Sequence, residues 1–112
     1  MKKFIVTYLA PYDATWKTQE STPEEMEAGM KAWMAWAEKC GNKLVDMGSP
    51  LGNALTLRPG GSASSSESEI IGYSLLQADS MEEALSLLNE HPHLDWNAAC
   101  EIEVHESLPM PG

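Results

Sequence analysis

Two helix-start signals divide this chain of 112 residues into two halves. In the first half Thr22 precedes Pro23, and Glu25 follows the threonine by three residues. In the second half Glu83 follows Ser80 by the same spacing. A Ser or Thr with a Glu three residues later is the capping box of a helix N-terminus, and proline is favoured at the first helical position. Two helices are therefore predicted, one in each half.

The first predicted helix, 23–40, has a broad apolar stripe and ends before Gly41, a residue type favoured just past a helix C-terminus. At about 100° per residue the stripe indicates a helix that covers one face of a sheet. Trp33 is central and is expected in the core, whereas Trp36 at the edge is the better candidate for a pocket wall or subunit contact. The stripe consists of Met26, Gly29, Met30, Trp33, Ala37 and Cys40.

Strand-like runs surround the two helices. They are 3–9, 43–47, 54–58, 70–78 and 98–106. We expect 54–58 and 70–78 to be the arms of one hairpin, and the glycine- and serine-rich segment 59–69 to be its flexible tip. With 43–47 as an extra short strand, the order is β-α-β-β-α-β in a single domain, 1–112. This order is typical of a ferredoxin-like α+β fold, an antiparallel sheet with two helices on one face.

Composition excludes several classes of partner. Asp and Glu number 17 against 7 Lys and Arg, a net charge of -10, which repels nucleic acid and anionic lipid. No run approaches the roughly 20 apolar residues of a membrane span. Lys2-Lys3 and the apolar run after them imitate a signal peptide without its cleavage site, so a first strand in a cytoplasmic protein is expected. Cys40 and Cys100 fit no zinc signature and are expected as buried thiols; no metal or cofactor is predicted.

Short motifs in both halves share their order and spacing with a known family. They are Leu44-Val45-Asp46, Gly48-Ser49-Pro50-Leu51, Ile71-Gly72-Tyr73-Ser74, Ala78-Asp79-Ser80, Glu83-Ala84, His91-Pro92-His93-Leu94 and Ile102-Glu103-Val104. Together they resemble the YCII-related family. The resemblance implies a ferredoxin-like fold assembled as a dimeric α/β barrel. Some members are thought to be enzymes with a His-Asp pair, and one branch is a dehydrochlorinase of chloroaromatic degradation. The first-helix histidine of those members has no counterpart here.

Two residues are candidates for acid–base chemistry. Asp46 ends a short strand before a glycine turn, where a partly buried carboxylate can act as a general base or can simply cap the turn. His93 follows the second helix and can act as the matching acid, or pack and cap within its loop. Tyr73 joins Trp36 and Trp33 as a candidate substrate-binding residue, because a buried phenol needs a hydrogen-bond partner. Its alternative is to pack across the sheet.

Two functions are therefore expected. The first is a small cofactor-free enzyme that performs proton abstraction or elimination on a small aromatic or lactone-like molecule, with Asp46 as base and His93 as acid. The alternative is a non-catalytic small-molecule-binding or interaction module on the same dimeric barrel. In both cases the partner is a second copy, because a monomer would expose too much apolar sheet surface. That surface is predicted to include Val6, Tyr8, Leu55, Leu57, Ile71, Tyr73 and Leu75.

Overall fold

The structure is a computed structural model that describes residues 1–11, 22–96 and 98–110. It is an α+β fold built on a four-stranded sheet with the strand order β2-β5-β1-β6. The strands are β1 (Lys2–Leu9), β2 (Leu44–Asp46), β5 (Ile70–Ala78) and β6 (Glu101–Glu106). All three pairings are antiparallel. The predicted α+β class and antiparallel sheet are confirmed, and the arrangement is compatible with a ferredoxin-like fold.

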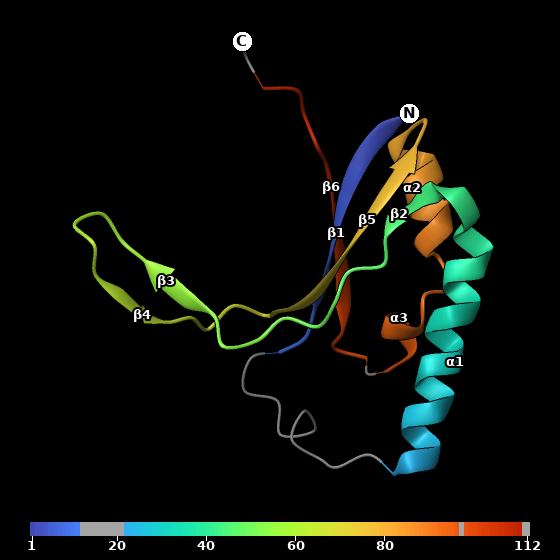
Figure 1. Cartoon of the computed structure of the whole chain (residues 1–112), viewed down its shortest axis with the longest axis horizontal. Helices are drawn as coiled ribbons and strands as arrows, with labels where there is room; N and C mark the ends of the chain where they lie inside the picture. Colours follow the sequence, from blue (N-terminus) through green and yellow to red (C-terminus); the bar gives the residue numbers. More distant parts are fainter. Residues whose placement is uncertain (12–21, 97, 111–112) are drawn as a thin grey trace.

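Three helices lie along one side of the sheet in the described part of the chain, where the sequence predicted two (Figure 1). They are α1 (Pro23–Cys40), α2 (Met81–Leu88) and α3 (Pro92–Trp96), and a 3-10 turn, η2 (Gly41–Lys43), follows α1. The additional helix begins at Pro92. Proline suits a first helical position, while the residue before it resists helical conformation. His91 therefore separates α2 from α3.

Both predicted helix starts are confirmed. Thr22 Oγ1 accepts a hydrogen bond from the Glu25 backbone N–H at 3.1 Å. Ser80 Oγ accepts one from the Glu83 backbone N–H, also at 3.1 Å. Each bond satisfies a backbone donor that has no partner within its own helix. The two caps thus fix where α1 and α2 begin.

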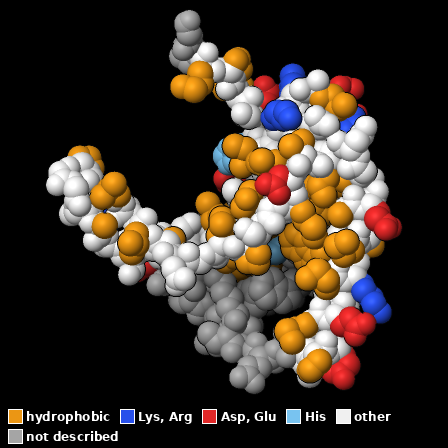
Figure 2. Space-filling view, viewed as in Figure 1, with side chains coloured by type: hydrophobic (Ala, Val, Ile, Leu, Met, Phe, Trp, Pro, Cys, Tyr) orange, Lys and Arg blue, Asp and Glu red, His pale blue; other side chains and the backbone are white. Residues whose placement is uncertain are grey.

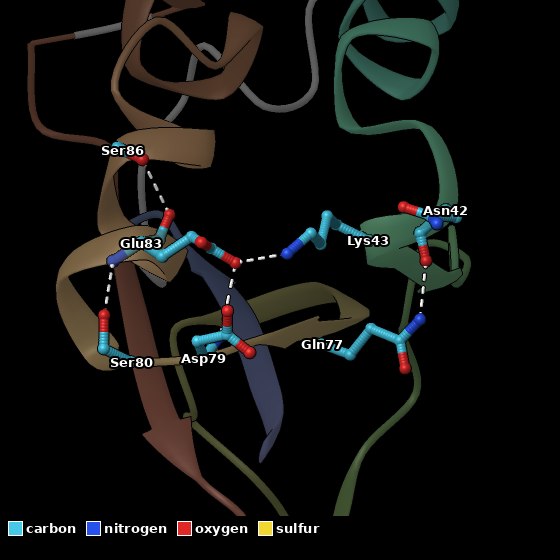
Figure 3. A network of polar contacts seen from close by, with 7 residues as sticks. All are labelled: Asn42, Lys43, Gln77, Asp79, Ser80, Glu83 and Ser86. Atoms are coloured by element: carbon cyan, nitrogen blue, oxygen red, sulfur yellow. Dashed lines mark hydrogen bonds and ion pairs between the residues drawn. The ribbon is translucent and has the colours of Figure 1, made fainter. Parts of the chain in front are cut away.

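Glu83 also joins α2 to the turn before β2. Its Oε1 accepts hydrogen bonds from Lys43 Nζ at 2.6 Å and from the Asp79 backbone N–H at 3.2 Å. The hydrogen bond between the two charged groups raises the pKa of Lys43 and lowers the pKa of Glu83. Beside this pair, Gln77 Nε2 donates to the Asn42 carbonyl at 2.6 Å. Figure 3 shows that these contacts fasten η2 to the junction of β5 and α2.

The hydrophobic core lies between the helices and the two central strands. Alternate residues of β1 and β5 point to the helices, and we call this side of the sheet the covered face. Its buried residues on the strands are Phe4, Val6, Tyr8, Gly72, Ser74, Leu76 and Ala78. The helices contribute Trp36, Cys40, Ala84 and Leu88 to the same cluster. Cys40 and Cys100 are both buried, as predicted.

Only the C-terminal half of α1 covers the sheet. Trp36 and Cys40 are buried, whereas Met26 and Met30 are 59% and 62% exposed. The predicted sheet-facing stripe is therefore wrong for the first half of α1, because that half extends beyond the end of the sheet (Figure 1). Within the described residues, no helix combines the length and the apolar character needed to cross a membrane.

A two-stranded hairpin projects from the body of the molecule, and we call it the arm (Figure 1). It consists of β3 (Leu55–Leu57) and β4 (Ala63–Ser65). The predicted pairing of 54–58 with 70–78 is wrong, because β3 pairs with β4, while β5 pairs with β1 and β2. Gly60 and Gly61 explain the difference: their φ angles of 97° and 91° allow a tight turn inside the segment expected to be a long tip. The flexibility of 59–69 stays a prediction.

Candidate functional site

Asp46 lies at the edge of the sheet and is exposed. Its Oδ1 accepts a hydrogen bond from the Gly48 backbone N–H at 2.8 Å, which makes it a turn cap. Gly48 is required in this turn, because it has a φ of 79° and a Cβ there would lie 1.8 Å from the Tyr73 carbonyl oxygen. The sequence left two roles open for Asp46, a general base and a turn cap. The structure shows the turn cap.

His93 lies in α3 and is only 4% exposed. Its Nε2 lies 2.9 Å from the Leu9 carbonyl oxygen, and a hydrogen bond to that oxygen ties α3 to the end of β1. The His93 backbone N–H donates to His91 Nδ1 at 3.0 Å. Because His91 Nδ1 is an acceptor, the proton of the neutral His91 ring lies on Nε2. His93 is therefore held by the fold from both its ring and its backbone.

His91 is completely buried among aromatic rings. Its ring centroid lies 4.8 Å from that of Tyr8 and 4.4 Å from those of Trp33 and Trp36. Among the described residues its Nε2 has no hydrogen-bond partner. Burial lowers the pKa of His91 to about 4, so the ring is neutral at neutral pH. We call these four residues and His93 the aromatic–histidine cluster.

Of the two tryptophans of this cluster, Trp33 packs against the core as predicted, whereas Trp36 is buried more deeply than predicted. Trp36, expected at a pocket wall, is 4% exposed, and its Nε1 donates to the Leu87 carbonyl at 2.8 Å. Trp33, expected in the core, is half-buried and packs edge-on against Tyr8 with a centroid distance of 5.1 Å. Trp36 is more buried because Leu87 of α2 lies against its indole, a contact that the residue spacing within α1 does not reveal.

A buried polar chain connects the cluster to the Asp46 turn. The Tyr8 hydroxyl and Ser74 Oγ lie 2.6 Å apart, and Ser74 Oγ donates to the Met47 carbonyl at 2.7 Å. Because the Ser74 hydroxyl hydrogen points to the Met47 carbonyl, Ser74 Oγ acts as the acceptor for the Tyr8 hydroxyl. Burial raises the pKa of Tyr8 to about 12, which keeps the phenol neutral. The sequence prediction missed Tyr8 and Ser74 as polar partners; the signal was a serine at a buried position of an apolar strand.

The candidate residues are divided between the two sides of the sheet. His93, Trp33 and Trp36 lie on the covered side. Tyr73 pairs with Thr7 on the opposite side, which we call the open face, and Asp46 pairs with Leu75 of that face. The structure therefore brings His93 together with the tryptophans, and it does not bring Asp46 or Tyr73 into that group.

The open face combines an apolar centre with acidic side chains at one edge. By strand register its members are Lys3, Ile5, Thr7, Leu9, Ile71, Tyr73, Leu75, Gln77, Glu101, Glu103 and His105. Val6 and Tyr8, predicted to belong to the uncovered surface, lie on the covered face, and Leu55 and Leu57 lie in the arm. His105 Nε2 pairs with the Glu103 carboxylate. Within residues 1–11, 22–96 and 98–110, no three His, Cys, Asp or Glu side chains are grouped to hold a metal ion.

No model of a known protein family matches this chain, and no curated protein matches it. The resemblance to the YCII-related family therefore depends on the sequence motifs alone.

Proposed function

We propose that this protein is a homodimeric, non-catalytic binding module of the YCII-related, ferredoxin-like type, in which the open faces of two sheets pack together as a dimeric α/β barrel. One observation carries the proposal: the open face is apolar at its centre and has no helix over it in the described structure (Figure 1). A sheet with one solvated face normally carries polar residues there. The centre of this face, at Ile5 and Leu75, departs from that pattern.

The apolar centre of the open face spans the two middle strands. Ile5 is 42% exposed, and its register partner Leu75 is half-buried beside it. The next pair along the strands is Thr7 with half-buried Tyr73. Apolar side chains that remain in contact with water favour association, since their burial contributes about 25 cal/mol per Å². A partner that covers this centre would therefore stabilise the fold.

The charges of the open face favour a second copy as that partner. Lys3 lies at one end of β1, whereas Glu101 and Glu103 lie toward the other end, opposite Leu9 and Thr7. A two-fold axis that crosses the strands within the interface puts the Lys3 end of each copy over the acidic end of the other. The face is self-complementary in this orientation, although the whole chain is acidic.

The groups expected to catalyse have structural partners instead. The Asp46 carboxylate caps the Gly48 turn at 2.8 Å, and His93 Nε2 contacts the Leu9 carbonyl at 2.9 Å. A general base and its matching acid must both reach one substrate. These two residues are associated with opposite sides of the sheet, which favours the binding module over the enzyme.

A charge introduced in the centre of the open face tests the dimer. We expect Ile5→Glu to convert the dimer to a folded monomer in light-scattering chromatography at micromolar concentration, because it would bury two uncompensated carboxylates. The matched control is Met30→Glu, at an exposed apolar residue of α1 away from this face; it should leave the dimer intact. A monomeric wild type, or an Ile5→Glu variant that stays dimeric, would overturn the proposal.

A second function, acid–base chemistry on a small aromatic or lactone-like molecule, has one observation in its favour. Within the part of the chain that the structure describes, His91 Nε2 is a buried donor without a partner, and an orphaned buried donor is costly unless a ligand oxygen accepts from it. Trp33 and Trp36 pack against His91 and would report binding by fluorescence. Saturable quenching by a small lactone, followed by its turnover, and the loss of both in His91→Leu would favour the enzyme. If the wild type shows neither quenching nor turnover, the binding module remains the proposed function.

A further inference from the structure

We infer that the arm crosses to the second copy and packs its leucine face on that copy's C-terminal segment, 107–110. The inference rests on the proposed dimer and identifies a second contact between its subunits. Two projections take part, the arm and segment 107–110, and both have exposed apolar side chains.

The arm has one apolar side and one polar side. Leu55 and Leu57 are two residues apart on β3 and so point to the same side, where they face Ser65 and Ala63 of β4. The two leucines are 69% and 73% exposed. Thr56 points to the other side of the ribbon. The leucine side therefore has the form of a contact surface, and the described residues of its own chain leave it exposed.

An isolated two-stranded hairpin is at best marginally stable in water. The arm forms hydrogen bonds of its own, such as Ser66 N–H to the Ala54 carbonyl at 2.9 Å at its base and Arg58 N–H to the Ser62 carbonyl at 2.8 Å near its turn. Those bonds fix its shape and leave the leucines in water. Packing of the leucine side on another chain would supply the missing stabilisation.

The C-terminal segment presents the complementary apolar residues. It leaves β6 where the Ser107 N–H donates to the Lys3 carbonyl at 2.9 Å. Leu108 and Met110 are 70% and 90% exposed. Pro109 between them favours an extended backbone. The segment is thus a short apolar strip beside the Lys3 end of the open face.

The positions of the two projections match the symmetry of the proposed dimer. Figure 1 shows the arm and the C-terminal segment leaving opposite ends of the sheet, both on the side away from the helices. The two-fold axis that crosses the strands exchanges these ends, so the arm of each copy meets the C-terminal segment of the other. Figure 2 shows hydrophobic side chains along the arm and on the C-terminal segment, with a hollow between them on the same side of the molecule.

Disulfide trapping tests this contact, with Leu57→Cys and Leu108→Cys prepared as separate proteins and mixed to exchange subunits. We expect mild oxidation to give covalent dimers in the mixture and far fewer in either protein alone, because like positions lie at opposite ends of a two-fold dimer. The control Thr56→Cys, on the other side of β3, should trap much less with Leu108→Cys. Native Cys40 and Cys100 are 3% and 6% exposed and should remain unreactive.

The outcomes separate this inference from the proposed dimer. If the wild type is a dimer by light scattering but the mixture traps no more than the single variants or the Thr56→Cys control, the arm does not reach the partner's segment. If a Leu57→Cys/Leu108→Cys double variant forms its disulfide within one chain, the arm contacts its own segment and the inference is wrong. A wild type that is monomeric at micromolar concentration overturns the dimer itself.

Discussion

The two faces of the same four strands show how one alternating pattern can serve two purposes. On β5, Leu76 points to the helices and has no exposed surface, whereas its neighbour Leu75 points to the open face and is half-buried. On β1, buried Tyr8 and half-exposed Thr7 repeat the contrast. The covered face is complete within one chain. The open face is not, and the proposed second copy would explain its apolar centre.

The largest difference is expected between the two neighbouring leucines. Leu76→Ala should lower the free energy of unfolding by about 2–5 kcal/mol, because it leaves a cavity in a packed core. Leu75→Ala should cost less than about 1 kcal/mol in the monomer, since it creates no cavity there. Urea unfolding, at a dilution where the proposed dimer would have dissociated, measures both. Equal losses would remove the distinction between the faces.

The histidines of the two faces should differ in their effect on pH stability. The pKa of His91 is about 4 in the folded chain and near 6.5 when unfolded, so below pH 6.5 the unfolded state binds the proton more tightly. The contribution of His91 to stability is therefore constant above pH 6.5 and falls from there to about pH 4, by up to about 3 kcal/mol. His91→Leu should remove this slope from urea-unfolding measurements.

The control for His91 is His105, which is exposed on the open face. His105→Gln should leave the slope between pH 6.5 and 4 unchanged. A slope that survives His91→Leu, or one that disappears with His105→Gln, would contradict the assignment to the buried ring.

A smaller contrast is expected between the tyrosines. Tyr8→Phe removes one partner of the 2.6 Å hydrogen bond to Ser74, and we expect a loss of about 1–2 kcal/mol. Tyr73→Phe on the open face should change unfolding by less than about 0.5 kcal/mol. Thermal unfolding of the two variants gives the comparison. A larger loss for Tyr73→Phe would mean that its hydroxyl has an important partner.

The smallest effect is expected at Asp46. Asp46→Asn keeps an oxygen that accepts the Gly48 N–H, so stability should change by less than about 0.5 kcal/mol. Asp46→Ala removes the cap and should cost about 1 kcal/mol. The pair is compared by urea unfolding. A large loss in Asp46→Asn would show that the negative charge, and not only the oxygen acceptor, stabilises this turn.

Local signals predicted the helix starts correctly because Thr22 and Ser80 act on backbone donors within four residues of themselves. The pairing of the arm could not be predicted in the same way. A run such as 54–58 can pair with any strand, and only the turn at Gly60 and Gly61 selects β4. Likewise, how much of α1 extends past the core depends on where the sheet ends. The helical spacing of Met26 and Met30 carries no information about that end.

The candidate site was predicted less well than the fold for a related reason. Residue type and position indicated that Asp46, His93 and Tyr73 could do chemistry, but not on which side of the sheet each would lie. A bulge between Leu44 and Asp46 shifts the register, so that Asp46 pairs with Leu75 of the open face. The aromatic–histidine cluster itself joins residues 8, 33, 36, 91 and 93, a grouping made by the tertiary fold.

The most direct test of the account is a filtered nuclear Overhauser measurement on a mixed dimer of labelled and unlabelled chains, which detects only contacts between copies. The account predicts contacts between copies from the methyl groups of Ile5 and Leu75, and none from those of their neighbours Val6 and Leu76. Intermolecular contacts at Met30 and Met34 of α1 instead, or none at all, would contradict it.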